Sequence, residues 1–210
     1  MVRLCITGGI GSGKSGVSEL LRVRDVPVYD CDREAKRLMT ADGAIRTALE
    51  QLVAQPEPLY DDHGTLNRRL LAAYMFGHPD RVQAVNAIVH PAVRADFRRW
   101  TAEREAEGYT LVAMESAIVY EAGMEHDVDK VVLVYTPREE RIARTMERDH
   151  ATRESVLARM ASQMSDEEKL ARAHYIIRNA EADAVTPQVE DLMKTLGGID
   201  RKTTLTITNK

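Results

Sequence analysis

Short apolar segments alternate along the chain with stretches of helical periodicity. Five apolar runs have the length of a strand and are bounded by glycine, proline or polar residues; they cover residues 3–7, 26–30, 111–115, 130–135 and, more weakly, 174–178. Between these runs, apolar residues recur at helical spacing, as Val17, Leu20 and Leu21 do after the first. Strands that alternate with helices are typical of βαβ units. The pattern therefore predicts an α/β fold with a parallel five-stranded sheet flanked by helices.

The strand pattern disappears between about Ala35 and Tyr109. Apolar residues there form three helical stripes, which are Ile45, Leu49, Leu52 and Val53; Val82, Val85 and Val89; and Val93, Phe97 and Trp100. We expect Pro91 to end the second of these helices, because proline removes a backbone donor. The stretch is therefore predicted to be a helical insertion between two strands of the sheet.

A second helical stretch follows the fourth apolar run. It opens at Thr136-Pro137, is rich in arginine and acids, and repeats apolar residues every four positions at Val156, Met160 and Met164. A last helix carries Val189, Leu192, Met193 and Leu196. Gly197-Gly198 is predicted to end this helix, because glycine is common just after a helix, and residues 199–210 are predicted to be a tail.

Composition narrows the class of protein. Among 210 residues, 29 are basic and 33 acidic, and the net charge of −4 gives no general bias toward nucleic acid. The apolar runs are far shorter than a membrane span, and no apolar leader precedes Gly8. Two cysteines, Cys5 and Cys31, are too few for a disulfide framework. We predict a cytoplasmic protein that binds neither nucleic acid nor membranes, with nothing to suggest more than a monomer.

Residues 8–15, Gly-Gly-Ile-Gly-Ser-Gly-Lys-Ser, fit the pattern G-x-x-x-x-G-K-[ST] between a predicted strand and a predicted helix. Glycines let backbone N–H groups point inward around a phosphate, and the start of the helix adds unpaired donors. Lys14 can reach the β- and γ-phosphates, and the Ser15 hydroxyl can bind Mg²⁺. The loop predicts a nucleoside triphosphate site, but not what is done with the nucleotide.

Acidic residues follow the second and third predicted strands, where ligands bind in open α/β sheets. Asp30 and Asp32 close the second strand, and Glu115 closes the third. A carboxylate at this edge can orient an attacking hydroxyl or accept its proton, and Glu115 is placed like an acid near the metal. The other interpretation is that these are solvated acids at strand ends with no ligand.

Arginines in the later helical stretch can neutralise charge on a triphosphate. Acids are interleaved with them, so a solvated helix face with salt bridges is an equally good interpretation of any single one. These arginines are Arg141, Arg144, Arg148, Arg153 and Arg159.

From residue 3 to about residue 196 the chain resembles the dephospho-CoA kinase family, which catalyses the last step of coenzyme A synthesis. The resembling segments occur in the family's order and are Thr7–Ser15, Val28–Asp32, Gly64–Arg68 with Phe76, Asn86–Pro91, Ile118–Glu121, Arg144–Asp149, Gln163 and Ile177–Asn179.

The resemblance implies a kinase with a P-loop NTPase-type sheet, which transfers the γ-phosphate of ATP to the ribose 3′-hydroxyl of dephospho-CoA with Mg²⁺. By position, Asp32 would be the base or hydroxyl-orienting acid, and Lys14 and Arg148 would act on the phosphates. Asp32, Arg68 and His90 would lie at the dephospho-CoA substrate. The nucleotide would be bound by Gly9, Gly11, Ser12, Gly13, Lys14, Ser15, Gly16, Arg144 and Asn179, with Ser15 also on the metal.

The same resemblance implies a division of the chain. Residues 1–34, 110–137 and 174–198 would form the nucleotide-binding core, residues 35–109 the helical CoA-substrate region, and residues 138–173 a mobile helical lid.

Some positions depart from the family's pattern. Gly16 stands where the family usually has threonine, which removes a hydroxyl near the phosphates and weakens the helix by about 1 kcal/mol relative to alanine. His63 and Asn67 replace usual acids, and Glu115-Ser-Ala117 replaces a turn that contains proline. We expect an active kinase with a lowered affinity for its nucleotide.

Two other functions remain open at this point. A kinase for a nucleoside monophosphate or another small molecule would use the same loop, although an insertion of roughly 70 residues favours a larger acceptor. A switch protein that hydrolyses a triphosphate slowly belongs to a different class. The chain has no Asn-Lys-x-Asp segment for guanine, and a need for an acceptor would distinguish kinase from switch.

Overall fold

The structure is a computed structural model that describes residues 1–196. The predicted helix end at Gly197-Gly198 and the predicted tail 199–210 lie outside the described residues. Within the described part, the chain forms two compact units. The first unit joins Met1–Asp30 to the chain from Trp100 onward, and the second unit is Cys31–Arg99.

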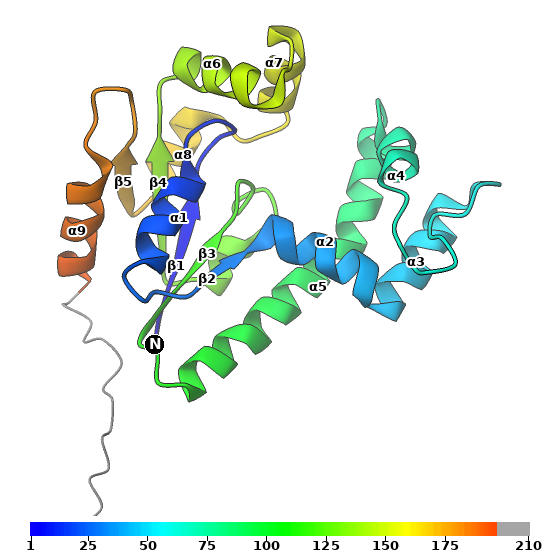
Figure 1. The fold of residues 1–210 in the computed structure, drawn as a ribbon, viewed down its shortest axis with the longest axis horizontal. Helices are drawn as coiled ribbons and strands as arrows, with labels where there is room; N and C mark the ends of the chain where they lie inside the picture. Colours follow the sequence, from blue (N-terminus) through cyan, green and yellow to red (C-terminus); the bar gives the residue numbers. More distant parts are fainter. Residues whose placement is uncertain (197–210) are drawn as a thin grey trace, which may run out of the picture. The chain divides into compact units, whose positions relative to one another are not determined.

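The first unit contains a sheet of five parallel strands, drawn with its helices in Figure 1. The strand order is β2-β3-β1-β4-β5, so the first strand is central. The strands are β1 (Val2–Thr7), β2 (Val28–Asp30), β3 (Leu111–Glu115), β4 (Lys130–Tyr135) and β5 (Tyr175–Arg178). The predicted five-stranded parallel sheet flanked by helices is confirmed.

Alternate residues of the strands explain how helices cover the sheet. Leu4 and Ile6 of β1 are fully buried and face the same cluster as Val17 and Leu21 of α1 (Lys14–Arg22). Val189 and Leu192 of α9 (Val185–Thr195) complete that cluster. The two helices therefore share one face of the sheet, since the period of two places every second side chain on it.

Three helices follow β4 where the sequence predicts one helical stretch: α6 (Arg138–Asp149), α7 (Arg153–Ala161) and α8 (Asp166–Arg172). The breaks have local causes. His150 ends α6 in the left-handed conformation, with φ 50°, and the side chain of Thr152 caps α7. Ser165 caps α8 in a reciprocal capping box with Glu168. A one-turn helix, η1 (Met124–Asp127), precedes β4.

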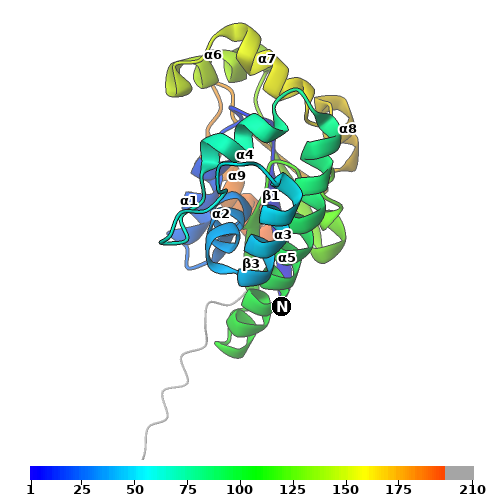
Figure 2. The same cartoon turned by 90° about the vertical axis from the view of Figure 1, so that its right-hand side faces the viewer.

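The second unit is helical, and Figure 2 labels its helices. It contains α2 (Cys31–Ala41), α3 (Gly43–Val53), α4 (Arg68–Met75) and the start of α5 (Pro79–Ala106). Tyr60 and Leu66 form an isolated antiparallel bridge, and the Tyr60 hydroxyl donates to the Met39 carbonyl over 2.6 Å.

The prediction that Pro91 ends a helix is wrong, because α5 continues through it for 28 residues in all. A proline inside a helix removes one backbone hydrogen bond. Here Val85, Val89, Val93 and Phe97 are all buried along one continuous stripe, and this packing outweighs the local preference of proline. No helix among residues 1–196 is long and apolar enough to cross a membrane.

Candidate nucleotide-binding site

The glycine loop connects β1 to α1, as the sequence predicts. Gly11 and Gly13 have φ values of 77° and 86°, in the left-handed region that favours glycine. A Cβ on Gly13 would lie 2.1 Å from Asn179 Nδ2, and a Cβ on Gly11 would lie 2.4 Å from the Arg141 carbonyl oxygen. The glycines are therefore required both by the turn and by the close approach of later segments.

Lys14 and Ser15 stand at the helix end of this loop. The Lys14 ammonium donates to the carbonyl oxygens of Gly8 and Gly9 over 2.9 and 3.3 Å. The Ser15 hydroxyl donates to Glu115 Oε1 over 2.9 Å. Glu115 ends β3 and is in register with both Ile6 and Asp30. The structure thus brings the predicted metal-binding serine together with the acid that the strand pattern singles out.

The side chains of Asn179 and Thr136 form hydrogen bonds with the loop. The Ser12 carbonyl accepts from Asn179 Nδ2 over 2.8 Å and from the Thr136 hydroxyl over 3.0 Å. Arg144 donates from NH1 to the Asn179 carbonyl over 2.9 Å. Arg144 and Asn179, far apart in the sequence, are therefore joined at the loop. Sequence analysis did not identify Thr136 as part of the site, although it follows directly after an apolar strand.

Helix α6 lies beyond the carboxyl ends of the strands (Figure 1) and packs on the loop. Arg141 is buried, and its guanidinium occupies the space over Gly9, where an added Cβ would lie 1.8 Å from NH1. The same guanidinium donates to the carboxylate of Asp166. In this structure Arg141 therefore packs against the loop and forms an ion pair with Asp166.

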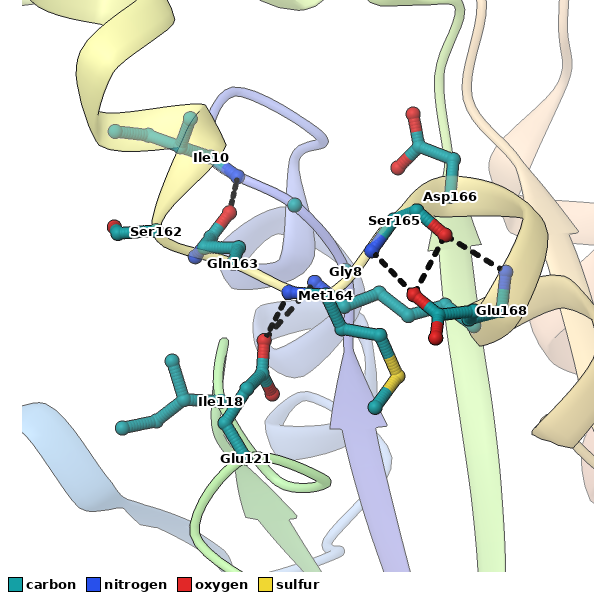
Figure 3. A network of polar contacts seen from close by, with 12 residues as sticks. Gly8, Ile10, Ile118, Glu121, Ser162, Gln163, Met164, Ser165, Asp166 and Glu168 are labelled. Atoms are coloured by element: carbon teal, nitrogen blue, oxygen red, sulfur yellow. Dashed lines mark hydrogen bonds and ion pairs between the residues drawn. The ribbon is translucent and has the colours of Figure 1, made fainter.

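Residue Gln163 contacts the loop directly. Its Oε1 accepts from the backbone N–H of Ile10 over 3.0 Å, as Figure 3 shows. In the sequence, Gln163 stands out only as one of the positions that carry the family resemblance. No periodicity or motif in a single sequence predicts this contact, since 153 residues separate its partners.

Arg148 has different surroundings from Arg144. Its side chain is 62% exposed and pairs with Asp149, with Nε–Oδ1 and NH2–Oδ2 distances of 2.7 and 3.1 Å. Asp149 also accepts from Arg159 NH1 over 2.7 Å. Hydrogen bonds from Arg148 and Arg159 hold the pKa of Asp149 well below its ordinary value. In this structure Arg148, which was predicted to be catalytic, therefore forms an ion pair with Asp149.

Three predicted site residues belong to the second unit. Strand β2 ends at Asp30, so the prediction that Asp32 closes the strand is wrong; Asp32 is exposed in the first turn of α2. A carboxylate in the first turn of a helix is stabilised by the positive end of the helix dipole. Arg68 is the first residue of α4, which Asn67 caps by accepting from the Leu70 N–H over 3.0 Å. His90 is half-buried within α5, and burial lowers its pKa.

Comparison with known proteins decides the family. Residues 2–184 match the family model described as dephospho-CoA kinase (CoaE). The chain belongs to the dephospho-CoA kinase family. This confirms the resemblance that the glycine loop and the later segments predict.

Relatives in the dephospho-CoA kinase family cover almost the whole chain. The dephospho-CoA kinase of Bacteroides fragilis (strain YCH46) is 43% identical over 192 residues, which are 91% of each chain. That of Porphyromonas gingivalis is 39% identical over 198 residues, 93% of this chain and 95% of the relative.

Solved structures agree with this family and fold. A crystal structure from Thermus thermophilus is 36% identical, with a TM-score of 0.76 over 95% of this chain and 98% of that chain. Shikimate kinase from Acinetobacter baumannii, 16% identical with a TM-score of 0.52 over 93% of each chain, shares the fold. The protein is therefore a kinase by family and a P-loop protein by fold.

Proposed function

We propose that the protein transfers the γ-phosphate of ATP to the ribose 3′-hydroxyl of dephospho-CoA, giving ADP and coenzyme A. The match of residues 2–184 to the dephospho-CoA kinase family carries the choice of acceptor. The hydrogen bond from Ser15 to Glu115, beside a glycine loop that also holds Lys14, supports the choice of a nucleotide as phosphate donor. This is the arrangement of donors and acceptors that a triphosphate with its metal requires.

The nucleotide would bind at the loop. The backbone N–H groups of Gly9, Gly11 and Gly13 and the start of α1 would supply donors for the phosphates, whereas those of Ile10, Ser12 and Gly16 donate to protein oxygens. The Lys14 ammonium would exchange the carbonyl oxygens of Gly8 and Gly9 for phosphate oxygens. Asn179 would lie near the adenine and Arg144 beside it, which their mutual hydrogen bond supports.

Mg²⁺ fits the donor set at the end of the loop. Ser15 and Glu115 offer a hydroxyl and a carboxylate oxygen 2.9 Å apart, and Mg²⁺ prefers such oxygen ligands with waters and phosphates completing its shell. No larger cluster of metal-binding side chains occurs among residues 1–196, which suits an ion that arrives with its nucleotide. When bound, the ion would neutralise charge on the β- and γ-phosphates.

The transfer itself forms a bond between the 3′-oxygen and the γ-phosphorus and breaks the bond from that phosphorus to ADP. The carboxylate of Asp32 would orient the hydroxyl and accept its proton. Arg68 and His90 would bind dephospho-CoA, and Arg148 would leave Asp149 to neutralise the transferring phosphate.

The proposal includes a division of labour along the chain. Residues 1–34, 110–137 and 174–198 would bind the nucleotide, 35–109 would bind dephospho-CoA, and 138–173 would form the lid. We further propose that one chain suffices for the reaction. A reducing cytoplasm suits Cys5 and Cys31, which are both buried and in no disulfide within residues 1–196.

The deciding experiment measures ADP release with ATP and Mg²⁺ in three reactions: with dephospho-CoA, with AMP, and with no acceptor. We expect release that requires dephospho-CoA, with coenzyme A formed in equal amount. Equal release without an acceptor would indicate a hydrolytic switch, and release with AMP alone would indicate a nucleotide kinase. Either result would reject the proposal.

A further inference from the structure

The turn between α7 and α8, residues 162–165, reaches back to the glycine loop. Gln163 Oε1 accepts the hydrogen bond of the Ile10 N–H, so this loop donor is already satisfied by a protein group. Gly9 and Gly11 stand on either side of Ile10, and glycines give the backbone more freedom than any other residue. The contact at Ile10 therefore restrains a residue that has glycine on both sides.

The residues that flank Gln163 are themselves fixed. The Met164 N–H donates to Glu121 Oε1 over 2.7 Å, and Figure 3 shows this contact beside that of Gln163. One residue further, Ser165 exchanges hydrogen bonds with Glu168, with 2.8 Å between Ser165 Oγ and Glu168 Oε2. These hydrogen bonds hold the turn, in this structure, with Gln163 against the loop.

Lys169 is a buried residue whose ammonium faces the carboxylate of Glu121. The residue has no exposed area, and its Nζ lies 3.7 Å from Glu121 Oε1 without a hydrogen-bond partner among the described residues. Burial lowers its pKa, while the nearby carboxylate of Glu121 acts in the other direction. A buried ammonium is costly unless a carboxylate faces it, so Lys169 depends on Glu121 for its charge in this position.

A second link runs in parallel from α8 to the loop. Asp166, the first residue of α8, accepts from the Arg141 guanidinium that covers Gly9. Two adjacent loop residues, Gly9 and Ile10, are therefore covered by side chains whose positions depend on the start of α8.

We infer that Gln163 is a positioning residue for the phosphate-binding loop, and that Glu121 and Lys169 hold it in place. The inference rests on the proposed function in one respect, that ATP binds in this loop. With Ile10 held from the side, the remaining N–H groups stay aimed at the phosphates before ATP arrives. Binding then avoids the cost of ordering the loop, which is the general benefit of preorganisation.

The test compares Gln163→Met with Ser162→Ala. Gln163→Met keeps the length of the side chain and removes the acceptor; Ser162→Ala is the matched control, since it loses a 2.8 Å hydrogen bond to the Arg159 carbonyl in the same turn. The dissociation constant of ATP with Mg²⁺ is measured calorimetrically without any acceptor. We expect about 5-fold to 10-fold weaker binding for Gln163→Met, the factor of one hydrogen bond, and less than 2-fold for Ser162→Ala.

The kinetic readout separates positioning from general damage. Gln163→Met should raise the KM for ATP by the same factor and leave the KM for dephospho-CoA within 2-fold. ATP binding within 2-fold of the unchanged protein, an equal loss in Ser162→Ala, or an equal rise in both KM values would overturn the inference. If the unchanged protein binds ATP but makes no coenzyme A, the proposed function fails, and the binding ratio still decides the role of Gln163.

Lys169→Met and Glu121→Gln test the supporting pair. Glu121→Gln keeps an oxygen acceptor for the Met164 N–H and removes only the charge opposite Lys169. If the pair acts through Gln163, adding Gln163→Met to either variant should weaken ATP binding by less than the product of the single effects. Independent, multiplicative effects would contradict the role of the pair while leaving that of Gln163 to the first test.

Discussion

The two units of this protein are stabilised in different ways. In the first, strand residues such as Leu4, Cys5 and Ile6 are fully buried, and side chains from distant segments meet at one loop. In the second, α3 and α5 bury apolar stripes, α2 and α4 bury only one or two residues each, and polar pairs connect helices. Arg37 of α2, for example, donates to the buried carboxylate of Asp96 in α5 over 2.7 Å.

This difference suggests a separation of tasks in the proposed reaction. Binding of the phosphates needs donors fixed in advance, and the sheet with its loop supplies them. The residues proposed for the acceptor, Asp32, Arg68 and His90, lie on three helices instead. Changes in the first unit should therefore damage nucleotide binding, whereas changes in the second should damage the chemistry or the acceptor.

The largest effect is expected for Lys14→Ala. The change removes a positive charge from the phosphates in both the bound and the transition state, so kcat/KM should fall by about 10³-fold, with a higher KM for ATP and a lower kcat. Steady-state kinetics with varied ATP would measure both. Lys194→Ala, on the exposed surface of α9, is the control. A loss confined to kcat would break the proposed separation between the units.

Asp32→Asn should have the next largest effect. Loss of a proton acceptor costs about 10²-fold or more in kcat, while calorimetric ATP binding should remain nearly unchanged because the loop lies in the other unit. Asp62→Asn, an exposed acid of the same unit, serves as the control. Near-normal kcat would transfer the role to Asp30 or reduce it to positioning.

Gly16 allows a finer comparison within the first unit. A Cβ added there meets nothing within 4 Å, so Gly16→Ala should raise the free energy of unfolding by about 0.5–1 kcal/mol through helix propensity. Gly16→Thr adds the missing hydroxyl as well. We expect only the threonine variant to lower the KM for ATP. Denaturant unfolding would measure the change in stability, and initial rates at varied ATP would measure the KM. An unchanged or higher KM for ATP in Gly16→Thr would show that a hydroxyl at this position does not strengthen ATP binding.

The smallest effect concerns His90 in the second unit. Its folded pKa is lowered below the ordinary 6.5 by burial, so the unfolded chain takes up its proton first as the pH falls. The contribution to stability is present above pH 6.5 and is lost as the pH falls from there through the folded pKa. The free energy of unfolding should therefore decline less steeply below pH 6.5 in His90→Gln than in the unchanged protein. Parallel curves would show that burial does not bias this titration.

Much of the first unit was predictable, because its buried parallel strands are short apolar runs bounded by glycine, proline or polar residues and separated by helical patterns. The strands 111–115 and 130–135 match their predicted bounds, and the loop from Gly8 to Ser15 takes its predicted place. Family resemblance, rather than periodicity, was needed to single out Asn179 and Arg144.

The second unit was harder to predict for a physical reason. The helices α2 and α4 carry few buried residues, Cys31 and Leu38 in one and Leu71 in the other, so no apolar stripe marked them. Ion pairs and a capping asparagine stabilise them instead. The role of Gln163 was equally hidden, since a contact between a turn and a loop leaves no pattern in the chain.

The strand order has a consequence for how the chain is made. β1 is central, yet its neighbours β3 and β4 are encoded more than a hundred residues later. At ordinary rates of translation, roughly 7 to 27 seconds separate the synthesis of Val2 from that of Tyr135. For most of that time the central strand has neither of its two neighbours in the chain. The nascent chain therefore has a long interval in which a chaperone, or another unpaired strand, can bind its first residues.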